Sequence, residues 1–470
     1  MSRAPHGAAP ARRFVRLAGA VAALAVAVVP AWAGTAGDAG EVSFARALLR
    51  LEARRAGKVR VLHFGDSHTV SGPVGGLVGG ALRAAFGDGG PGLGLPWTPP
   101  PYSVREGLRS GTTSGWRRVM PRYGDPPSEV GLWGCAVETD EAGQTAWIRG
   151  EAASVRVAYL RQPGGGAVQF LLDGAPIGEA DLDAPAPEVG VFEWNAGGDA
   201  ARRLEIRTTR RGRTRILGTT LERAEGGIVY SPVGILGARA DLLLKSRDDV
   251  FGALMRLEAP DLVIVAFGAN EAGDRPFDPR GYAALFDRAL ARIRAAAPQA
   301  EMLVVGPPDR AEREANGEWR SMATLDEIAR IQESAARRRG AAFFDLRRAM
   351  GGEGQIVRWA ERRRPLAQAD HVHYTSEGYA RLAQWIASEV FDLYGRARRA
   401  PALLAELRAE GDGSSDLLEA ARRPFTPPPF RGAAPPPTVA DREPPDGPTL
   451  AVGQVRAERL PNGKIVLRNN

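Results

Sequence analysis

The sequence predicts an α/β protein whose parallel sheet is interrupted by an all-β insertion. Residues 58–64, apolar at Val59, Val61, Leu62 and Phe64, are predicted to form a strand that runs into a Gly-Asp-Ser turn. Residues 261–267 form a nearly continuous apolar run followed by a glycine, as expected for a strand buried on both faces of a parallel sheet. Between residues 129 and 221 the pattern changes to short alternating runs separated by turn-forming residues, which indicates a β-sandwich of about seven strands. The length of 470 residues leaves room for about two or three domains.

The same periodicities place the other elements of the α/β part. Further buried strands are expected at 301–306 and 341–346, and helices at 73–86, 278–296, 322–338 and 376–394. In the last helix the apolar residues lie on one face, which should dock it on the sheet: Tyr379, Leu382, Ala383, Ile386, Val390 and Leu393.

A candidate nucleophile follows the first strand. The word GDSH, residues 65–68, places Ser67 in a tight turn between that strand and a helix. The carboxyl ends of parallel strands are where open α/β sheets hold their ligands, and a helix start offers backbone N–H groups there. Ser67 could also be an ordinary turn residue, because Asp-Ser is common turn chemistry.

A serine nucleophile needs a base, and the chain has five histidines. His63 and His68 are too close in sequence to Ser67 to approach its hydroxyl from a separate element, so we expect them to be structural or to line the pocket. The word DHVH supplies the base: Asp370 and His373 are three residues apart, a spacing that lets the carboxylate orient the imidazole.

His371 remains an alternative to His373 as the base. The two histidines could also bind a metal ion from one face of a strand. No third ligand is evident, and we expect neither a metal nor a cofactor.

Oxyanion donors are expected from three places. Asn270, in the word GAN after the strand at 261–267, could donate through its side-chain amide, although it could instead cap a helix. The backbone amide of Ser67 and that of Gly237, in the word GILGA, are the other candidates, with Gly234 as a near neighbour of Gly237.

Together these residues resemble the SGNH or GDSL hydrolase family, whose four blocks are named for Ser, Gly, Asn and His. The blocks correspond to Ser67, Gly237, Asn270 and the pair Asp370 and His373, and the resemblance covers residues 42–100 and 226–395. It implies a flavodoxin-like three-layer fold and an acyl-enzyme mechanism.

The insertion narrows this resemblance. An SGNH domain interrupted after its first block by a jelly-roll-like sandwich, similar to a carbohydrate-binding module, resembles the peptidoglycan O-acetylesterases and O-acetyltransferases of the bacterial envelope. Five aromatic residues of the insertion could contact sugars, although core packing is the simpler role for most: Trp133, Trp147, Tyr159, Phe192 and Trp194.

The two ends of the chain differ from its middle. Residues 1–33 have a basic start, an apolar run and an A-x-A site, which predicts a secretory signal peptide, with an uncleaved anchor as the alternative. The tail becomes proline-rich and is expected to be largely disordered, apart from a charged helical piece and a hairpin around Pro461–Gly463. The predicted units are a signal peptide at 1–33, hydrolase-domain segments at 42–110 and 229–396, the sandwich at 115–228 and the tail at 397–470.

Composition excludes some classes of function. Cys135 is the only cysteine, so no intramolecular disulfide forms, and its apolar surroundings without a nearby histidine disfavour a cysteine nucleophile. The net charge of +7 could favour anionic polymers, but no nucleic-acid fold signature is present, so we expect no nucleic-acid partner.

The sequence therefore predicts an exported carbohydrate O-acetylesterase of the periplasm or cell envelope, or one that is secreted. Its expected partner is an O-acetylated glycan: peptidoglycan by resemblance, with xylan-like polysaccharides as the alternative. An acetyltransferase using the same acyl-enzyme, or a wall-binding protein with an inactive site, would fit the same domains. The sequence indicates no oligomeric state. No membrane span is expected after signal cleavage, and an uncleaved signal segment is the alternative.

Overall fold

The computed structural model describes residues 36–54, 56–70, 74–97, 107–122 and 124–430, and the backbone of residues 455–459 and 465–469. The predicted signal peptide at 1–33 and the middle of the predicted tail lie outside these residues. No helix among the described residues is long and apolar enough to cross a membrane.

A parallel sheet forms the centre of the α/β part, in the strand order β17-β14-β13-β1-β12-β2. Apart from the short edge strand β2, this is the flavodoxin-like order that the resemblance implied. The strands are β1 (Lys58–Gly65), β2 (Asp88–Gly90), β12 (Gly227–Gly234), β13 (Leu262–Ala266), β14 (Glu301–Val305) and β17 (Ala342–Phe344).

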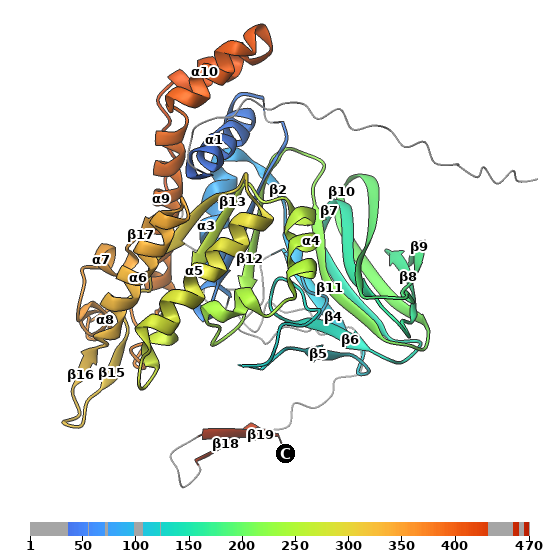
Figure 1. Ribbon diagram of the computed structural model, residues 1–470, viewed down its shortest axis with the longest axis horizontal. Helices are drawn as coiled ribbons and strands as arrows, with labels where there is room; N and C mark the ends of the chain where they lie inside the picture. The colour runs from blue at the N-terminus through green and yellow to red at the C-terminus, as the bar shows by residue number, and fades with distance from the viewer. Residues whose placement is uncertain are drawn as a thin grey trace, which may run out of the picture. The chain divides into compact units, whose positions relative to one another are not determined.

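Helices cover both faces of this sheet and make three layers (Figure 1). One face packs against α1 (Ala36–Arg54), α3 (Val74–Phe86) and α9 (Ser376–Ala397), and the other against α4 (Asp248–Glu258), α5 (Pro279–Ala296) and α6 (Thr324–Arg338). Shorter elements are α2 (Ser67–Val70), α7 (Leu346–Met350), α8 (Gln355–Ala360), the 3₁₀ turns η2 (Ala240–Leu244) and η3 (Glu271–Gly273), and the hairpin strands β15 (Ala311–Arg313) and β16 (Trp319–Ser321).

Strand β13 has apolar residues at consecutive positions because both faces of the sheet are covered. Leu262 and Ile264 belong to the core on one face of the sheet, whereas Val263 and Val265 belong to the core on the other. All four side chains are fully buried. Each position therefore has to be apolar, and the predicted strand between two helix layers is confirmed.

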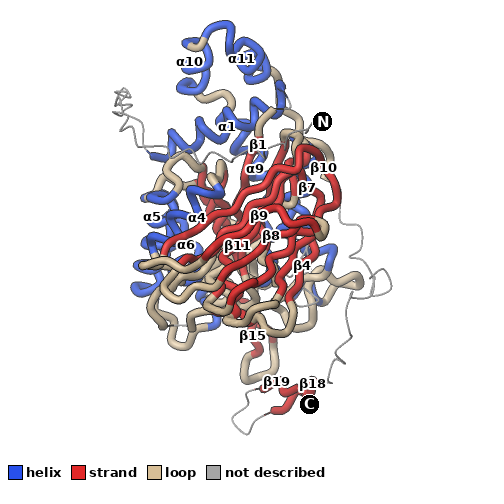
Figure 2. The backbone as a smooth tube through the Cα atoms, turned by 90° about the vertical axis from the view of Figure 1, so that its right-hand side faces the viewer, coloured by secondary structure: helices blue, strands red, loops and turns tan. Residues whose placement is uncertain are grey.

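The insertion forms an antiparallel sheet that folds over its own hydrophobic core as a sandwich (Figure 2). Two long strands, β7 (Thr145–Arg161) and β10 (Glu188–Arg210), pair along most of their length. The others are β3 (Gly92–Gly94), β4 (Leu108–Thr112), β5 (Arg117–Val119), β6 (Ala136–Thr139), β8 (Ala167–Leu172), β9 (Ala175–Asp181) and β11 (Thr214–Glu222).

The sandwich begins earlier than the predicted residue 115. Strand β4 pairs with β7, and β3 pairs with β11, so residues from Gly92 onward already belong to the antiparallel sheet. These two strands are short and glycine-containing, which hides the alternation that marks the longer strands.

The charged helical piece predicted at the start of the tail is confirmed, and it packs on the α/β core. Two helices, α10 (Pro401–Ala409) and α11 (Ser415–Arg422), follow α9, separated by the 3₁₀ turn η4 (Gly411–Ser414). Their residues Leu403, Leu407 and Leu417 are buried in the core that α1 and α9 share. Even Phe425, beside the first prolines, stacks on Phe86 with ring centroids 5.5 Å apart.

Near the end of the chain the predicted hairpin is confirmed. Strands β18 (Val455–Arg459) and β19 (Ile465–Asn469) pair antiparallel.

Candidate active site

Ser67 lies at the carboxyl end of β1, as its motif predicted. The chain turns sharply there: the Asp66 carbonyl accepts hydrogen bonds from the amides of Thr69 (3.1 Å) and Val70 (3.2 Å), and Asp66 Oδ1 accepts from the His68 amide at 2.9 Å. A Cβ on Gly65 would lie 2.0 Å from the Thr69 hydroxyl oxygen, so only glycine fits before this turn. The turn fixes the direction in which the Ser67 hydroxyl points.

The loop before α9 brings Asp370 and His373 to the same place. Asp370 Oδ1 accepts hydrogen bonds from the amides of Val372 and His373, both at 2.9 Å, and Asp370 Oδ2 lies 2.7 Å from His373 Nδ1. His373 Nε2 is 3.2 Å from Ser67 Oγ. The structure thus joins the three residues predicted as nucleophile, base and orienting acid in one hydrogen-bonded chain.

Asp370 is suited to remain ionised within this chain. Its partial burial opposes ionisation, but the hydrogen bonds from His373 and from two backbone amides outweigh burial and hold its pKa below the usual value. An ionised Asp370 accepts a hydrogen bond from the N–H group at His373 Nδ1, and this leaves Nε2 as the acceptor that faces Ser67.

His371 lies elsewhere. Its ring stacks on Trp319, with centroids 4.0 Å apart, and its Nδ1 is 3.0 Å from the Ala369 carbonyl oxygen. The structure therefore brings His373, and not His371, to Ser67. The backbone of His371 has a positive φ of 52°, and its carbonyl accepts from the Ala311 amide at 2.9 Å, which ties the loop to the hairpin β15–β16.

The two early histidines are buried behind the nucleophile. His63 Nδ1 is 2.7 Å from the Tyr230 hydroxyl, and burial lowers the pKa of His63 to about 3. His68 Nδ1 is 3.2 Å from the Tyr379 hydroxyl, and burial lowers its pKa as well. Its ring lies beside that of His373, with centroids 5.5 Å apart.

Asn270 lies at the end of β13 and faces the Ser67 turn. Its Nδ2 donates to the Ala238 carbonyl at 2.9 Å and contacts Asp66 Oδ2 at 3.4 Å. The second contact is at the long limit of a hydrogen bond, so this N–H can turn toward a developing oxyanion. Asn270 precedes η3, but its side chain makes no capping hydrogen bond.

Gly237 lies in the exposed turn between β12 and η2, with a positive φ of 70°. Among the described residues, none accepts a hydrogen bond from its amide. Gly234 is the last residue of β12, where an added Cβ would lie 2.0 Å from the Gly65 carbonyl oxygen, so it serves close strand packing. Of the two glycines, Gly237 is the one whose amide is open to a substrate.

Sequence reasoning missed the carboxylate that connects these turns. Glu271 is buried, and its two oxygens accept from the amides of Ala240 (2.8 Å) and Gly268 (3.1 Å), which join the Gly237 and Asn270 loops. Burial raises the pKa of Glu271 to about 7. The sequence offers one sign of this role, which is that Glu271 directly follows Asn270.

A second missed residue is Arg310, which donates to the Ala269 carbonyl at 2.6 Å. Burial lowers its pKa, and the carboxylates of Asp66 and Asp370 act in the opposite direction. It therefore adds positive charge near the nucleophile turn.

The site offers no metal cluster within the described residues. Cys135, a predicted non-participant, is buried, and burial raises its pKa to about 11, so its thiol stays protonated at neutral pH.

Part of the chain matches a known protein family. The model of the GDSL-like Lipase/Acylhydrolase family matches residues 196–381. This range includes Asn270, Asp370 and His373, whereas Ser67 precedes it. No curated protein sequence matches the chain significantly.

Several solved structures are similar. A peptidoglycan O-acetylesterase has a TM-score of 0.64 and 23% identity, covering 77% of this chain and 98% of its own. A family two carbohydrate esterase from Cellvibrio japonicus has a TM-score of 0.25 and 10% identity, covering 61% and 98%. An acetyl xylan esterase, AlAXEase, has a TM-score of 0.28 and 18% identity, covering 35% and 81%. The first of these three structures shares the fold of this chain.

Proposed function

We propose that this chain, in which residues 196–381 match the model of the GDSL-like Lipase/Acylhydrolase family, is an exported serine esterase that removes O-acetyl groups from a cell-wall glycan, with peptidoglycan as the favoured substrate. The observation that carries this proposal is the chain of contacts from Ser67 Oγ to His373 Nε2 (3.2 Å) and from His373 Nδ1 to Asp370 Oδ2 (2.7 Å). These are the contacts that a serine nucleophile needs for its activation.

The reaction proceeds through an acyl-enzyme. His373 takes the proton of Ser67 as its oxygen attacks the acetyl carbonyl, and Asp370 stabilises the imidazolium that forms. The amides of Ser67 and Gly237 and the side chain of Asn270 donate to the oxyanion. His373 then protonates the departing sugar hydroxyl, and water activated by the same imidazole releases acetate.

Two observations support the glycan substrate. The fold likeness to the peptidoglycan O-acetylesterase covers 77% of this chain, a share too large for either the α/β part or the sandwich alone. The signal-like segment at 1–33 supports export to a compartment where wall glycans occur.

The test replaces the nucleophile in the full-length protein. Ser67→Ala should lower turnover of 4-nitrophenyl acetate by at least about 10³-fold, while circular dichroism shows an unchanged fold. Ser334→Ala, at an exposed serine of α6, is the matched control and should keep full activity. A folded Ser67→Ala protein with wild-type turnover would overturn the esterase assignment.

Acetate release identifies the substrate. The wild-type protein should release more acetate from O-acetylated peptidoglycan than from acetylated xylan, and the reverse ranking would contradict peptidoglycan. Formation of acetylated product when a chito-oligosaccharide acceptor is added would instead support acetyl transfer.

A further inference from the structure

A groove of about 560 Å³ runs along the junction of the inserted sandwich and the α/β part. We propose that this groove binds the sugars next to the acetylated one and selects glycans that carry carboxylate groups. The inference rests on the proposed function, because it specifies the substrate class of the same site.

One end of the groove lies at the candidate oxyanion turn. The turn residues Gly237 and Ala238 line it, and the Ala238 carbonyl accepts from the Asn270 amide, which also contacts Asp66 beside Ser67. The groove is therefore linked to the nucleophile turn through the side chain of Asn270.

The walls of the groove expose apolar side chains from both domains. Met120 of the sandwich and Leu236 of the α/β part are 43% and 40% exposed, and they are two of the four large hydrophobic residues exposed within the described chain. Trp133 also lines the groove. A concave site with apolar walls and a few charged groups is typical of ligand binding, and the C–H faces of sugar rings pack against such walls.

Among the described residues that line the groove, Arg122 is the cation for which no described residue supplies an ion-pair partner. Arg239 makes a two-pronged pair with Asp274, at 2.7 and 2.6 Å, and Lys245 pairs with Asp241 at 3.0 Å. No described residue pairs with the guanidinium of Arg122, which is exposed at the sandwich wall. The groove thus has three cations against two carboxylates, and a substrate carboxylate would complete the pairing.

Hydrogen bonds hold the two walls together before any ligand binds. Lys245 Nζ donates to the Arg122 carbonyl at 2.6 Å, the Ser128 amide donates to the Lys245 carbonyl at 3.0 Å, and Ser246 Oγ donates to the Val130 carbonyl at 2.7 Å. These contacts cross between the sandwich segment and the start of α4.

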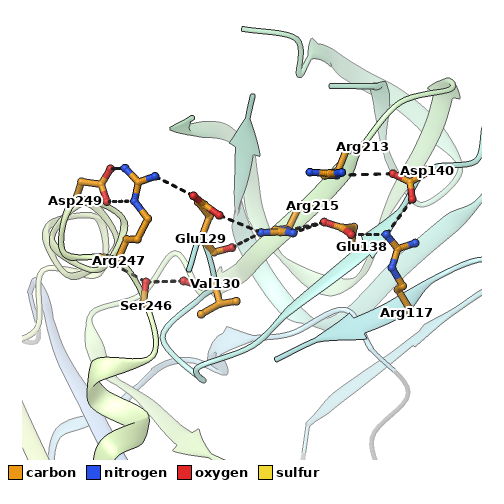
Figure 3. Close-up of polar contacts among 10 residues, drawn as sticks. All are labelled: Arg117, Glu129, Val130, Glu138, Asp140, Arg213, Arg215, Ser246, Arg247 and Asp249. Atoms are coloured by element: carbon orange, nitrogen blue, oxygen red, sulfur yellow. Dashed lines mark hydrogen bonds and ion pairs between the residues drawn. The ribbon is translucent and has the colours of Figure 1, made fainter. Parts of the chain in front are cut away.

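Ion pairs reinforce the same junction. Glu129 contacts Arg247 at 2.8 Å and Arg215 at 3.5 Å, so it connects the start of α4 to strand β11 (Figure 3). Because the groove is already formed, a ligand that binds there loses little binding free energy to the ordering of protein segments.

The experiment compares two forms of one polymer. O-acetylated peptidoglycan is used as isolated, and after its carboxylates are converted to neutral amides with carbodiimide and methylamine. The wild-type full-length protein should show a KM for acetate release about three- to tenfold lower on the charged form, and this preference should shrink as salt rises. Arg122→Gln should abolish the preference, whereas Arg211→Gln, an exposed arginine in the turn between β10 and β11, should retain it.

A second pair of variants tests the apolar wall. Met120→Gln should raise KM on both polymer forms, whereas Val191→Gln, at a sandwich residue of similar exposure (39%) outside the groove, should not. Equal KM values of the wild-type protein for both forms, or an unchanged preference in Arg122→Gln, would overturn the inference. If the wild-type protein cleaves 4-nitrophenyl acetate but neither polymer, the proposed glycan substrate fails instead. Peptidoglycan stripped of its stem peptides distinguishes carboxylates of the sugar from those of the peptide.

Discussion

The edge of the parallel sheet that holds the candidate active site and the junction with the sandwich use polar side chains in different ways. At the edge, Ser67 comes from the turn after β1 and the pair Asp370 and His373 from the loop before α9, and they form one short chain of contacts through His373. At the junction, arginines and carboxylates form a connected series in which Arg215 contacts Glu129 and Glu138 and Glu138 also pairs with Arg117 (Figure 3).

The difference lies in exposure and in the number of partners. The side chains of Asp370 and His373 are 46% and 37% exposed, as a substrate site requires, whereas those of Arg215 and Glu138 are only 10% and 4% exposed. Removing a group at the edge should therefore affect rate, and removing one at the junction should affect stability.

Asp370→Asn should have the largest effect. Its side-chain NH₂ would face His373 Nδ1, which favours the tautomer with a proton on Nε2 and leaves no acceptor for the Ser67 proton. We expect kcat for 4-nitrophenyl acetate to fall by about 10⁴-fold, with little change in urea stability. Asp412→Asn, at an exposed aspartate of η4, is the control, and equal activities of the two variants would contradict the role of Asp370.

Asn270→Ala should come next. It removes the side-chain oxyanion donor while the backbone donors remain, so kcat should fall by about 10²- to 10³-fold and KM should change little. The control is Asn316→Ala, in the exposed turn between β15 and β16. A rise in KM with kcat intact would show that Asn270 acts in substrate binding instead.

Arg215→Met should affect stability. It leaves the buried carboxylate of Glu138 with Arg117 alone and breaks the link to Glu129, which should lower the free energy of unfolding by about 3 kcal/mol. Arg337→Met, which breaks an exposed pair with Glu333 on α6, should change it by less than about 0.5 kcal/mol. Urea denaturation measures the free energy of unfolding of both variants. Equal losses in the two variants would contradict a larger contribution from the buried pair at the junction than from the exposed pair on α6.

Glu301→Gln should have the smallest and a pH-dependent effect. Burial raises the pKa of Glu301 to about 8, and its Oε2 has no hydrogen-bond partner among the described residues. Because the folded-state pKa lies above the unfolded value, its contribution to stability is complete below about pH 4.5 and is lost as pH rises to about 8. The variant should match the wild type near pH 4.5 and be more stable by on the order of 1–3 kcal/mol above pH 8.

Urea midpoints across that range provide the measurement for Glu301→Gln, and Glu225→Gln, at an exposed glutamate, is the control. A difference from the wild type that does not change with pH would contradict the assignment to Glu301.

Much of the site followed from sequence because its decisive relations are local or depend on strand ends. Asp370 and His373 are three residues apart, and their loop needs little outside help to bring carboxylate and imidazole together. Ser67 and Asn270 each follow a buried strand, and neighbouring parallel strands end at the same edge of the sheet. The domain layout also followed, since a parallel sheet and a sandwich have different periodicities.

Other features depend on segments that are distant in the chain. The leucines of α10 and α11 stand in a charged, proline-flanked segment whose sequence pattern does not indicate burial. They are buried because these two helices pack against the core shared by α1 and α9. The sandwich begins at Gly92 because β3 finds its partner in β11, which is more than 120 residues later. No local pattern reports such pairings.

Short-range patterns and strand-end positions were enough to predict the α/β class, the inserted all-β domain and the candidate residues Ser67, Asn270, Asp370 and His373, with His371 as an alternative base. Three other points depend on how distant segments pack. His373 and not His371 meets Ser67, Glu271 connects two loops, and Arg122 faces a groove in which no described residue pairs with its guanidinium. The physical reason is that hydrogen bonds, burial and charge pairing are set by distances in space, and these arise only when remote segments pack together.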